Sequence, residues 1–202
     1  MGKSTLLNSD RVAFFETAGW RAYYDHAWLK LLRLLVGLCQ EQFGIPFPIS
    51  LLAAYYTVKA SVAWVATDHN EEKVLAALTR FYELARRYSG LNYDPRQVAV
   101  LETKYWEVHR RLSGKPEKAE FIDTLTALHS ATFGIPPERA RESAELRVLA
   151  ANLVDGITSH TSTDPEADWR QIEVYLQQCY RSIKNQLEKP ESAMNSQGAF
   201  NS

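Results

Sequence analysis

Apolar residues recur every three to four positions along most of the chain, which is the period of amphipathic helices. No segment alternates apolar and polar residues for long enough to predict a strand. Helices are expected over residues 48–66, 71–88, 95–112, 117–133, 137–158 and 165–187. Residues 20–44 predict one more long helix, because these apolar residues keep the helical period: Tyr23, Tyr24, Ala27, Trp28, Leu31, Leu35, Leu38 and Cys39. The pattern therefore predicts an all-α protein.

Short local motifs mark where several of these helices begin and end. Asp94 and Asp164 each precede a proline, and Asp is a favoured N-cap while proline is tolerated at the first helical position. The sequence FGIP occurs at residues 43–46 and again at 133–136. Its glycine can end a helix and its proline cannot continue one, so both segments predict a chain reversal.

Several features of the first half recur in the same order in the second half. VAFFETAGW at residues 12–20 matches VAVLETKYW at 98–106 with a shift of 86 residues, and FGIP recurs with a shift of 90. Matching residues on the following helices, also at a shift of 90, are Ala54, Val58 and Ala60 with Ala144, Val148 and Ala150. The motif T-x-H at 67–69 recurs at 158–160 with a shift of 91. Small loop insertions explain the growing shift, so the order predicts a tandem duplication.

The duplication covers about residues 10–90 and 94–187, and each half consists of amphipathic helices. These properties predict an internally duplicated helical bundle in which two homologous units pack about a pseudo-twofold axis into one core. We expect residues 1–188 to form a single all-helical domain. Residues 189–202 are polar, contain a proline and lack periodicity, so they are expected to be a disordered tail.

Charge and composition narrow the classes of partner. The chain has 23 Lys and Arg against 24 Asp and Glu, so its net charge of -1 provides no overall field to attract nucleic acid. The most apolar run, residues 27–39, is shorter than the roughly 20 residues that span a bilayer. Cys39 and Cys179 lie in apolar helical patterns without C-x-x-C spacing and are expected to be buried thiols. A cytoplasmic location is therefore expected.

Glu16 and Glu102 are the most informative polar pair in the sequence. Each lies four residues before a tryptophan and four residues after a valine, which places both carboxylates on the apolar face of a helix. A buried charge there needs a partner or a shifted pKa. We expect each carboxylate to accept hydrogen bonds from a threonine, a tryptophan indole or an arginine and to hold the helices together. The alternative is a symmetric carboxylate pair for metal binding or proton transfer.

Three histidines extend the metal hypothesis. His69 and His160 occupy matching loops, and His109 lies seven residues after Glu102, so Glu16, Glu102, His69, His160 and His109 are the candidate metal ligands. Helix-ending hydrogen bonds are the favoured interpretation of the two loops, because threonine and aspartate surround both histidines. The chain lacks the Glu-x-x-His pairs of di-iron carboxylate bundles. His109 and His129 are expected to be hydrogen-bonded core residues.

Basic residues form small groups that suggest solvated, salt-bridged helix faces rather than a phosphate-binding track, since glutamates are interleaved with several of them. These groups are Arg86 with Arg87, Arg110 with Arg111, and Arg139 with Arg141 and Arg147. No nucleic-acid partner is expected.

Two hypotheses of function from different classes fit these features. The first is a non-enzymatic scaffold, adaptor or regulatory module that binds a protein partner or forms a homo-oligomer. The alternative is a helical-bundle oxidoreductase that depends on a metal or cofactor, or a hydrophobic-ligand binder, with a carboxylate and histidine site between the halves. No motif identifies a reaction, a substrate or a particular cofactor, so the sequence leaves open whether the chain is an enzyme.

Overall fold

The computed structural model describes residues 8–188, which form eight α-helices and, within that range, no strand. The helices are α1 (Ser9–Tyr24), α2 (Trp28–Phe43), α3 (Ile49–Val65), α4 (Glu71–Ser89), α5 (Pro95–Leu112), α6 (Ala119–Phe133), α7 (Pro137–Thr158) and α8 (Pro165–Leu187). The all-α prediction is confirmed. The expected disordered tail, residues 189–202, lies outside the described part of the chain.

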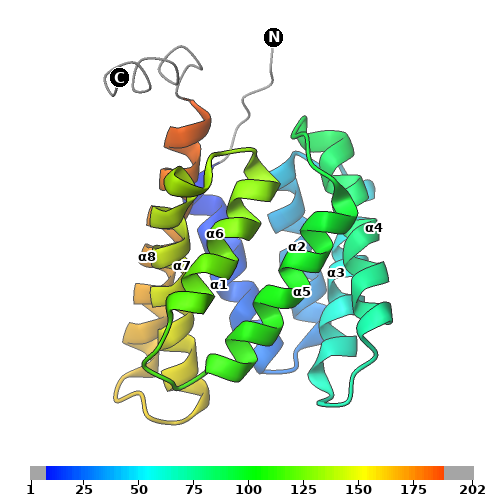
Figure 1. Cartoon of the computed structure of the whole chain (residues 1–202). Coiled ribbons are helices and arrows are strands. Elements are labelled where there is room, and N and C mark those ends of the chain that lie inside the picture. The colour runs from blue at the N-terminus through cyan, green and yellow to red at the C-terminus, as the bar shows by residue number, and fades with distance from the viewer. Residues whose placement is uncertain (1–7, 189–202) are drawn as a thin grey trace, which may run out of the picture.

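The eight helices close into a ring. Each helix packs against the next one along the chain, and α8 packs against α1. In Figure 1, α5 and α6 run in front of α1 and α2, with α7 and α8 on one side and α3 and α4 on the other. Connections of three to six residues make neighbouring helices antiparallel. This arrangement directs one face of every helix toward a common centre.

Local chemistry determines several helix ends, as the sequence predicts. The Asp94 and Asp164 carboxylates accept hydrogen bonds from the backbone N–H groups of Gln97 (2.7 Å) and Ala167 (3.0 Å), which caps α5 and α8. In both FGIP segments the glycine is left-handed, with φ of 64° at Gly44 and 67° at Gly134. The Phe and Ile side chains of both segments, at residues 43, 45, 133 and 135, are buried as expected.

The prediction of one long helix over residues 20–44 is wrong, because the chain turns between α1 and α2. His26 adopts a φ of 53°, and the N–H of Ala27 donates to the Ala22 carbonyl at 2.9 Å. The turn, residues 25–27, contains neither glycine nor proline, so it lacks the usual sequence signal. Apolar residues on both sides of the turn face the interior, and Tyr23 contacts Trp28 across it with ring centroids 6.0 Å apart. The apolar period therefore continues although the helix does not.

Buried apolar side chains form three clusters within the wall of the ring. The first contains residues of α3, α4, α5, α6 and α7. The second contains residues of α1, α6, α7 and α8, and the third contains residues of α1, α2, α3 and α4. Both cysteines are buried and free, as expected. Across the part of the chain that the structure describes, no helix is both long and apolar enough to span a membrane. The wall is thus packed by these clusters, while the centre of the ring holds the cavity described next.

Candidate functional site

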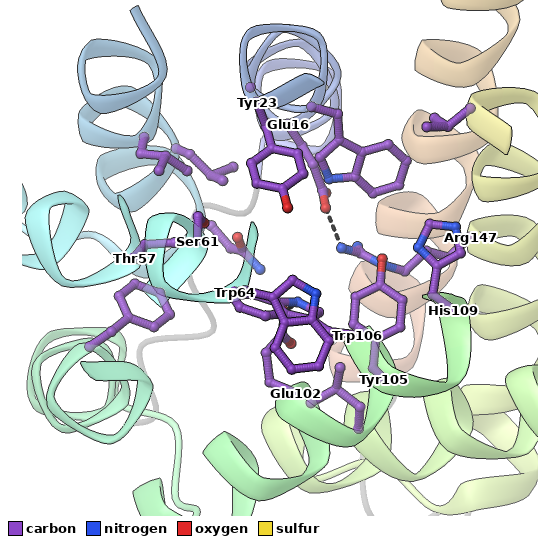
Figure 2. A pocket seen from close by; sticks show the side chains of 18 of the residues that line it. Glu16, Tyr23, Thr57, Ser61, Trp64, Glu102, Tyr105, Trp106, His109 and Arg147 are labelled. Atoms are coloured by element: carbon purple, nitrogen blue, oxygen red, sulfur yellow. Dashed lines mark hydrogen bonds and ion pairs between the residues drawn. The ribbon is translucent and has the colours of Figure 1, made fainter. Parts of the chain in front are cut away.

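A cavity of about 530 Å³ occupies the centre of the ring, and all eight helices contribute side chains to it. Its walls are rich in aromatic residues, which include Trp20, Tyr23, Trp64, Phe81, Tyr105 and Trp106. Figure 2 shows several of these rings around a common space, with Glu16 and Glu102 on opposite sides of it. Sites for small organic molecules typically enclose about 300–1,000 Å³ and combine apolar walls with a few polar groups. The cavity has the size and the lining of such a site.

The first polar group on the wall is a buried ion pair between α1 and α7. Arg147 donates a hydrogen bond to one carboxylate oxygen of Glu16, and the hydroxyl of Tyr180 on α8 donates to the other. The Glu16 side chain is 6% exposed and that of Arg147 is 11% exposed. The guanidinium carbon also lies 5.4 Å from the Trp20 ring centre and 5.6 Å from that of Tyr105. The ion pair and the hydrogen bond from Tyr180 together join three helices beside the cavity.

Arg147 stays protonated in this environment. Burial alone lowers the pKa of an arginine, but Glu16 and the other acidic groups around the guanidinium together outweigh burial and raise the pKa of Arg147 above its usual value. Burial also raises the pKa of Tyr180, which keeps its hydroxyl proton available for the bond to Glu16. Glu16 is therefore neutralised by a cation of its own chain.

Glu102, on α5, has a different set of partners. Its Oε1 accepts a hydrogen bond from Trp106 Nε1 at 2.8 Å, and its Oε2 accepts one from the Tyr82 hydroxyl of α4 at 3.2 Å. Among residues 8–188 no lysine, arginine or histidine forms an ion pair with this carboxylate. Burial raises the pKa of Glu102, although the more distant charge of Arg147 and the two hydrogen bonds oppose the rise. Glu102 is a cavity-lining carboxylate with neutral donors only.

A third polar group lies where α5 and α7 face each other. His109 Nε2 is 3.0 Å from Asp155 Oδ1, and Lys118 Nζ is 3.5 Å from Asp155 Oδ2. The imidazole also stacks on the Phe121 ring, with centroids 5.2 Å apart. Burial would raise the pKa of Asp155, but the hydrogen bond and charge of His109, with Lys118, lower it below its usual value. Asp155 therefore stays ionised and orients His109 beside the cavity.

His129 is a buried neutral histidine on the wall. Its Nδ1 lies 2.8 Å from Ser143 Oγ, and that hydroxyl donates its own proton to the Ala140 carbonyl at 2.7 Å. The serine oxygen must therefore accept the bond from His129 Nδ1–H, which fixes the tautomer. Burial and the charge of Arg147 lower the pKa of His129 to about 3. The prediction of a hydrogen-bonded core histidine is confirmed.

The five candidate metal ligands do not converge. Glu16, Glu102 and His109 line the cavity, whereas His69 and His160 do not. His69 ends α3, with its Nδ1 3.0 Å from the Ala66 carbonyl, and His160 is exposed in the turn after α7. Within the described residues no three His, Cys, Asp or Glu side chains are close enough to hold a metal ion. The metal hypothesis stays a prediction without a ligand cluster to support it.

Sequence reasoning missed the partners of the two glutamates. The interpretation of Arg147 as part of a solvated basic face is wrong, because its side chain is nearly buried against Glu16. A signal was present: Arg147 lies three residues after Ala144 and seven before Val154, on the buried face of α7. The expected kinds of donor are nevertheless found, since Glu16 pairs with an arginine and Glu102 with a tryptophan indole.

Comparison with known proteins adds no relative. No protein-family model matches the chain, and neither does a curated protein or a solved structure.

Proposed function

We propose that the chain binds a small, largely aromatic organic molecule in the central cavity. The observation that carries this proposal is the cavity itself: about 530 Å³, formed by all eight helices, with aromatic walls and a few polar groups. Of the two hypotheses from the sequence, this favours the hydrophobic-ligand binder with a carboxylate and histidine site. A purely structural bundle gains stability by filling such a space with side chains.

We further propose that the cavity lies between two homologous halves related by a pseudo-twofold axis. The helices α1 to α4 would correspond to α5 to α8. Two pairings support this: Glu16 of α1 bonds Tyr180 of α8, and Glu102 of α5 bonds Tyr82 of α4. Left-handed glycines at the ends of α2 and α6 support the same correspondence. At the shift of 90 residues that relates α3 to α7, the counterpart of Arg147 is Thr57.

The binding proposal can be tested with N-phenyl-1-naphthylamine, a neutral aromatic probe whose fluorescence rises in apolar surroundings. We expect the full chain to bind the probe and Ser61→Phe to weaken binding at least about tenfold, because Ser61 lines the cavity and the larger ring fills it. Val62→Phe is the matched control, since the neighbouring Val62 side chain is 47% exposed. No binding by the unmodified chain, or equal binding by both variants, would reject the proposal.

A second candidate function is self-association through the outer face of α3. This face exposes Leu51, Leu52, Tyr55, Val62 and Val65, and Lys59 is the one charged residue of the helix. Exposed apolar surface of this kind marks interaction sites, and a largely apolar face can pack against the same face of a second copy in a twofold dimer. Light scattering would measure the molar mass of the chain, with Tyr55→Glu expected to convert a dimer to a monomer. A monomeric unmodified chain would remove this candidate.

A further inference from the structure

We infer that the molecule bound in the cavity carries a positive charge, as an organic ammonium ion or a cationic nitrogen heterocycle, and that Glu102 is its counter-charge. This inference rests on the proposed function and specifies the class of ligand. Three observations carry it: the charges of the cavity wall, the aromatic faces beside Glu102, and the difference between the two halves of the chain.

The charges of the wall leave Glu102 without a cation. Three carboxylates line the cavity, on Glu16, Glu102 and Asp155. Glu16 pairs with Arg147, and Asp155 lies within ion-pair distance of His109 and Lys118. Glu102 has hydrogen bonds from two neutral donors and, within residues 8–188, no ion pair. A ligand cation placed here would neutralise a carboxylate that the chain itself does not.

The walls of the cavity already accommodate cations of the chain. The Arg147 guanidinium lies over Trp20 and Tyr105, and the Arg110 guanidinium lies 4.4 Å from the Trp64 ring centre. Aromatic faces carry partial negative charge and attract such groups. Trp106 continues this wall beside Glu102, with its ring centroid 5.7 Å from that of Trp64. An aromatic surface next to an unpaired carboxylate is suited to a flat cation.

The two halves differ at one decisive position. Glu16 lies in the first half, and Tyr180 and Arg147 of the second half complete its surroundings. Glu102 lies in the second half, and Tyr82 of the first half takes the role of Tyr180 beside it, but Thr57 of the first half stands where the correspondence would place an arginine. Thr57 lines the cavity, and Figure 2 shows it on α3. The ligand cation would therefore take beside Glu102 the place that the Arg147 guanidinium takes beside Glu16.

Other ligand charges fit this wall less well. An anionic ligand would lie near Glu102, which forms no ion pair within residues 8–188, and the buried Arg147 is already bound to Glu16. Arg110 is exposed, so water screens its charge and reduces its attraction for an anion. A neutral ligand would leave Glu102 buried and unneutralised.

The test compares three ligands of one shape and three charges: 2-naphthylmethylammonium, 2-naphthalenemethanol and 2-naphthoate. Each ligand is titrated against the full chain with bound N-phenyl-1-naphthylamine, and the loss of fluorescence measures its displacement of the probe. Calorimetry then measures each affinity directly. We expect the ammonium ion to bind at least about tenfold more tightly than the alcohol, and the carboxylate to bind most weakly. Equal affinities, or tightest binding of the carboxylate, would overturn the inference while probe binding keeps the proposed function. Absence of probe binding would reject both.

Two variants identify the group responsible. Glu102→Gln should remove the advantage of the ammonium ion and leave the affinity of the alcohol within about twofold. Glu107→Gln removes the same charge from an exposed position of α5 and should change neither affinity. Thr57→Arg should also remove the ammonium preference by supplying an internal cation, whereas Thr57→Met adds bulk without charge and should keep it. An unchanged preference in Glu102→Gln, or equal loss in both Thr57 variants, contradicts the assignment.

Discussion

Glu16 and Glu102 occupy matching positions in two copies of the motif E-T-x-x-W, and each accepts a hydrogen bond from a tyrosine of a neighbouring helix. They differ in whether a positively charged side chain contacts the carboxylate. Glu16 contacts the guanidinium of Arg147, whereas Glu102 contacts the neutral indole of Trp106. The nine-residue segments around the two glutamates share five residues, and the cation that Glu16 contacts comes from α7, far along the chain.

The comparison distinguishes a structural role from a ligand-binding role for a carboxylate on an apolar helix face. A buried carboxylate that is neutralised within the chain holds helices in register, and removing one partner leaves an uncompensated charge. A carboxylate without a cation costs stability in the ligand-free protein and can recover that cost when a cation binds. The Glu16 region should therefore be sensitive to charge removal, and the Glu102 region should tolerate it.

The largest effect is expected from Arg147→Met, which keeps the length of the side chain but removes its charge. Glu16 would remain buried without a cation, and we expect the free energy of unfolding to fall by about 3–5 kcal/mol in urea denaturation. Adding Glu16→Gln to this variant should recover part of the loss. Thr57→Ala, at the position that the proposed duplication matches with Arg147, should cost less than about 1 kcal/mol. Similar losses in the two single variants would contradict the comparison.

The second largest effect is expected when the pH is lowered, because the free energy of unfolding should fall. His129 has a pKa of about 3 in the folded chain, below its ordinary value of 6.5, so only the unfolded chain takes up this proton between those pH values. Stability contributed by the neutral histidine is present above pH 6.5 and is lost as the pH falls toward 3. Between pH 6.5 and 4.5 we expect a loss of about 2–3 kcal/mol in the free energy of unfolding.

The matched variant for this acid effect is His129→Asn, whose amide can still donate to Ser143. Its free energy of unfolding should depend less steeply on pH between 6.5 and 4.5 than that of the unmodified chain. Parallel pH profiles for the two proteins would show that a group other than His129 causes the loss of stability in acid.

A smaller effect is expected from Glu16→Gln. Glutamine keeps hydrogen-bonding capacity toward Arg147 and Tyr180 but leaves the guanidinium without its counter-charge. We expect a loss of about 2 kcal/mol, less than for Arg147→Met, because Glu102 still interacts with Arg147 at longer range. Thermal and urea unfolding at neutral pH measure it. A neutral or stabilising change would mean that this ion pair contributes nothing to the fold.

Local chemistry made much of the fold predictable, and long-range contacts account for what was missed. The starts of α5 and α8 follow from an Asp–Pro pair, and the ends of α2 and α6 follow from glycine. The turn at His26 has no such residue, so the apolar period conceals it. Closure of the ring brings α8 against α1, and nothing in the sequence near either helix specifies that contact.

In the candidate site, the two glutamates were predictable from local sequence, but the partner of Glu16 and the cavity were not. A charge on an apolar helix face is a local pattern, and it identified Glu16 and Glu102 before their surroundings were known. The partner Arg147 lies 131 residues from Glu16 in the sequence, so its role depends on the folded arrangement. In the loop of His160 the Thr161 hydroxyl bonds the Gly156 carbonyl and Asp164 caps α8, as expected, whereas in the loop of His69 the bond to the Ala66 carbonyl comes from His69 itself rather than from Thr67 or Asp68. The cavity itself arises from all eight helices and has no sequence motif.

The smallest expected effect, and the one with the opposite sign, is that of Glu102→Gln on the ligand-free chain. Burial raises the pKa of Glu102, so above its unfolded-state pKa the ionised form lowers the stability of the fold. Removing the charge should therefore increase the free energy of unfolding at pH 7 by about 1 kcal/mol, while Trp106 and Tyr82 keep a hydrogen-bonding partner. At pH 3, well below the ordinary pKa of a glutamate, the carboxyl is protonated in both states, so the gain should disappear. Urea unfolding at the two pH values measures the difference, with Glu107→Gln as the exposed control on the same helix. A loss of stability at pH 7 equal to that of Glu16→Gln would show that the chain itself compensates Glu102, and the contrast between the two glutamates would then no longer hold.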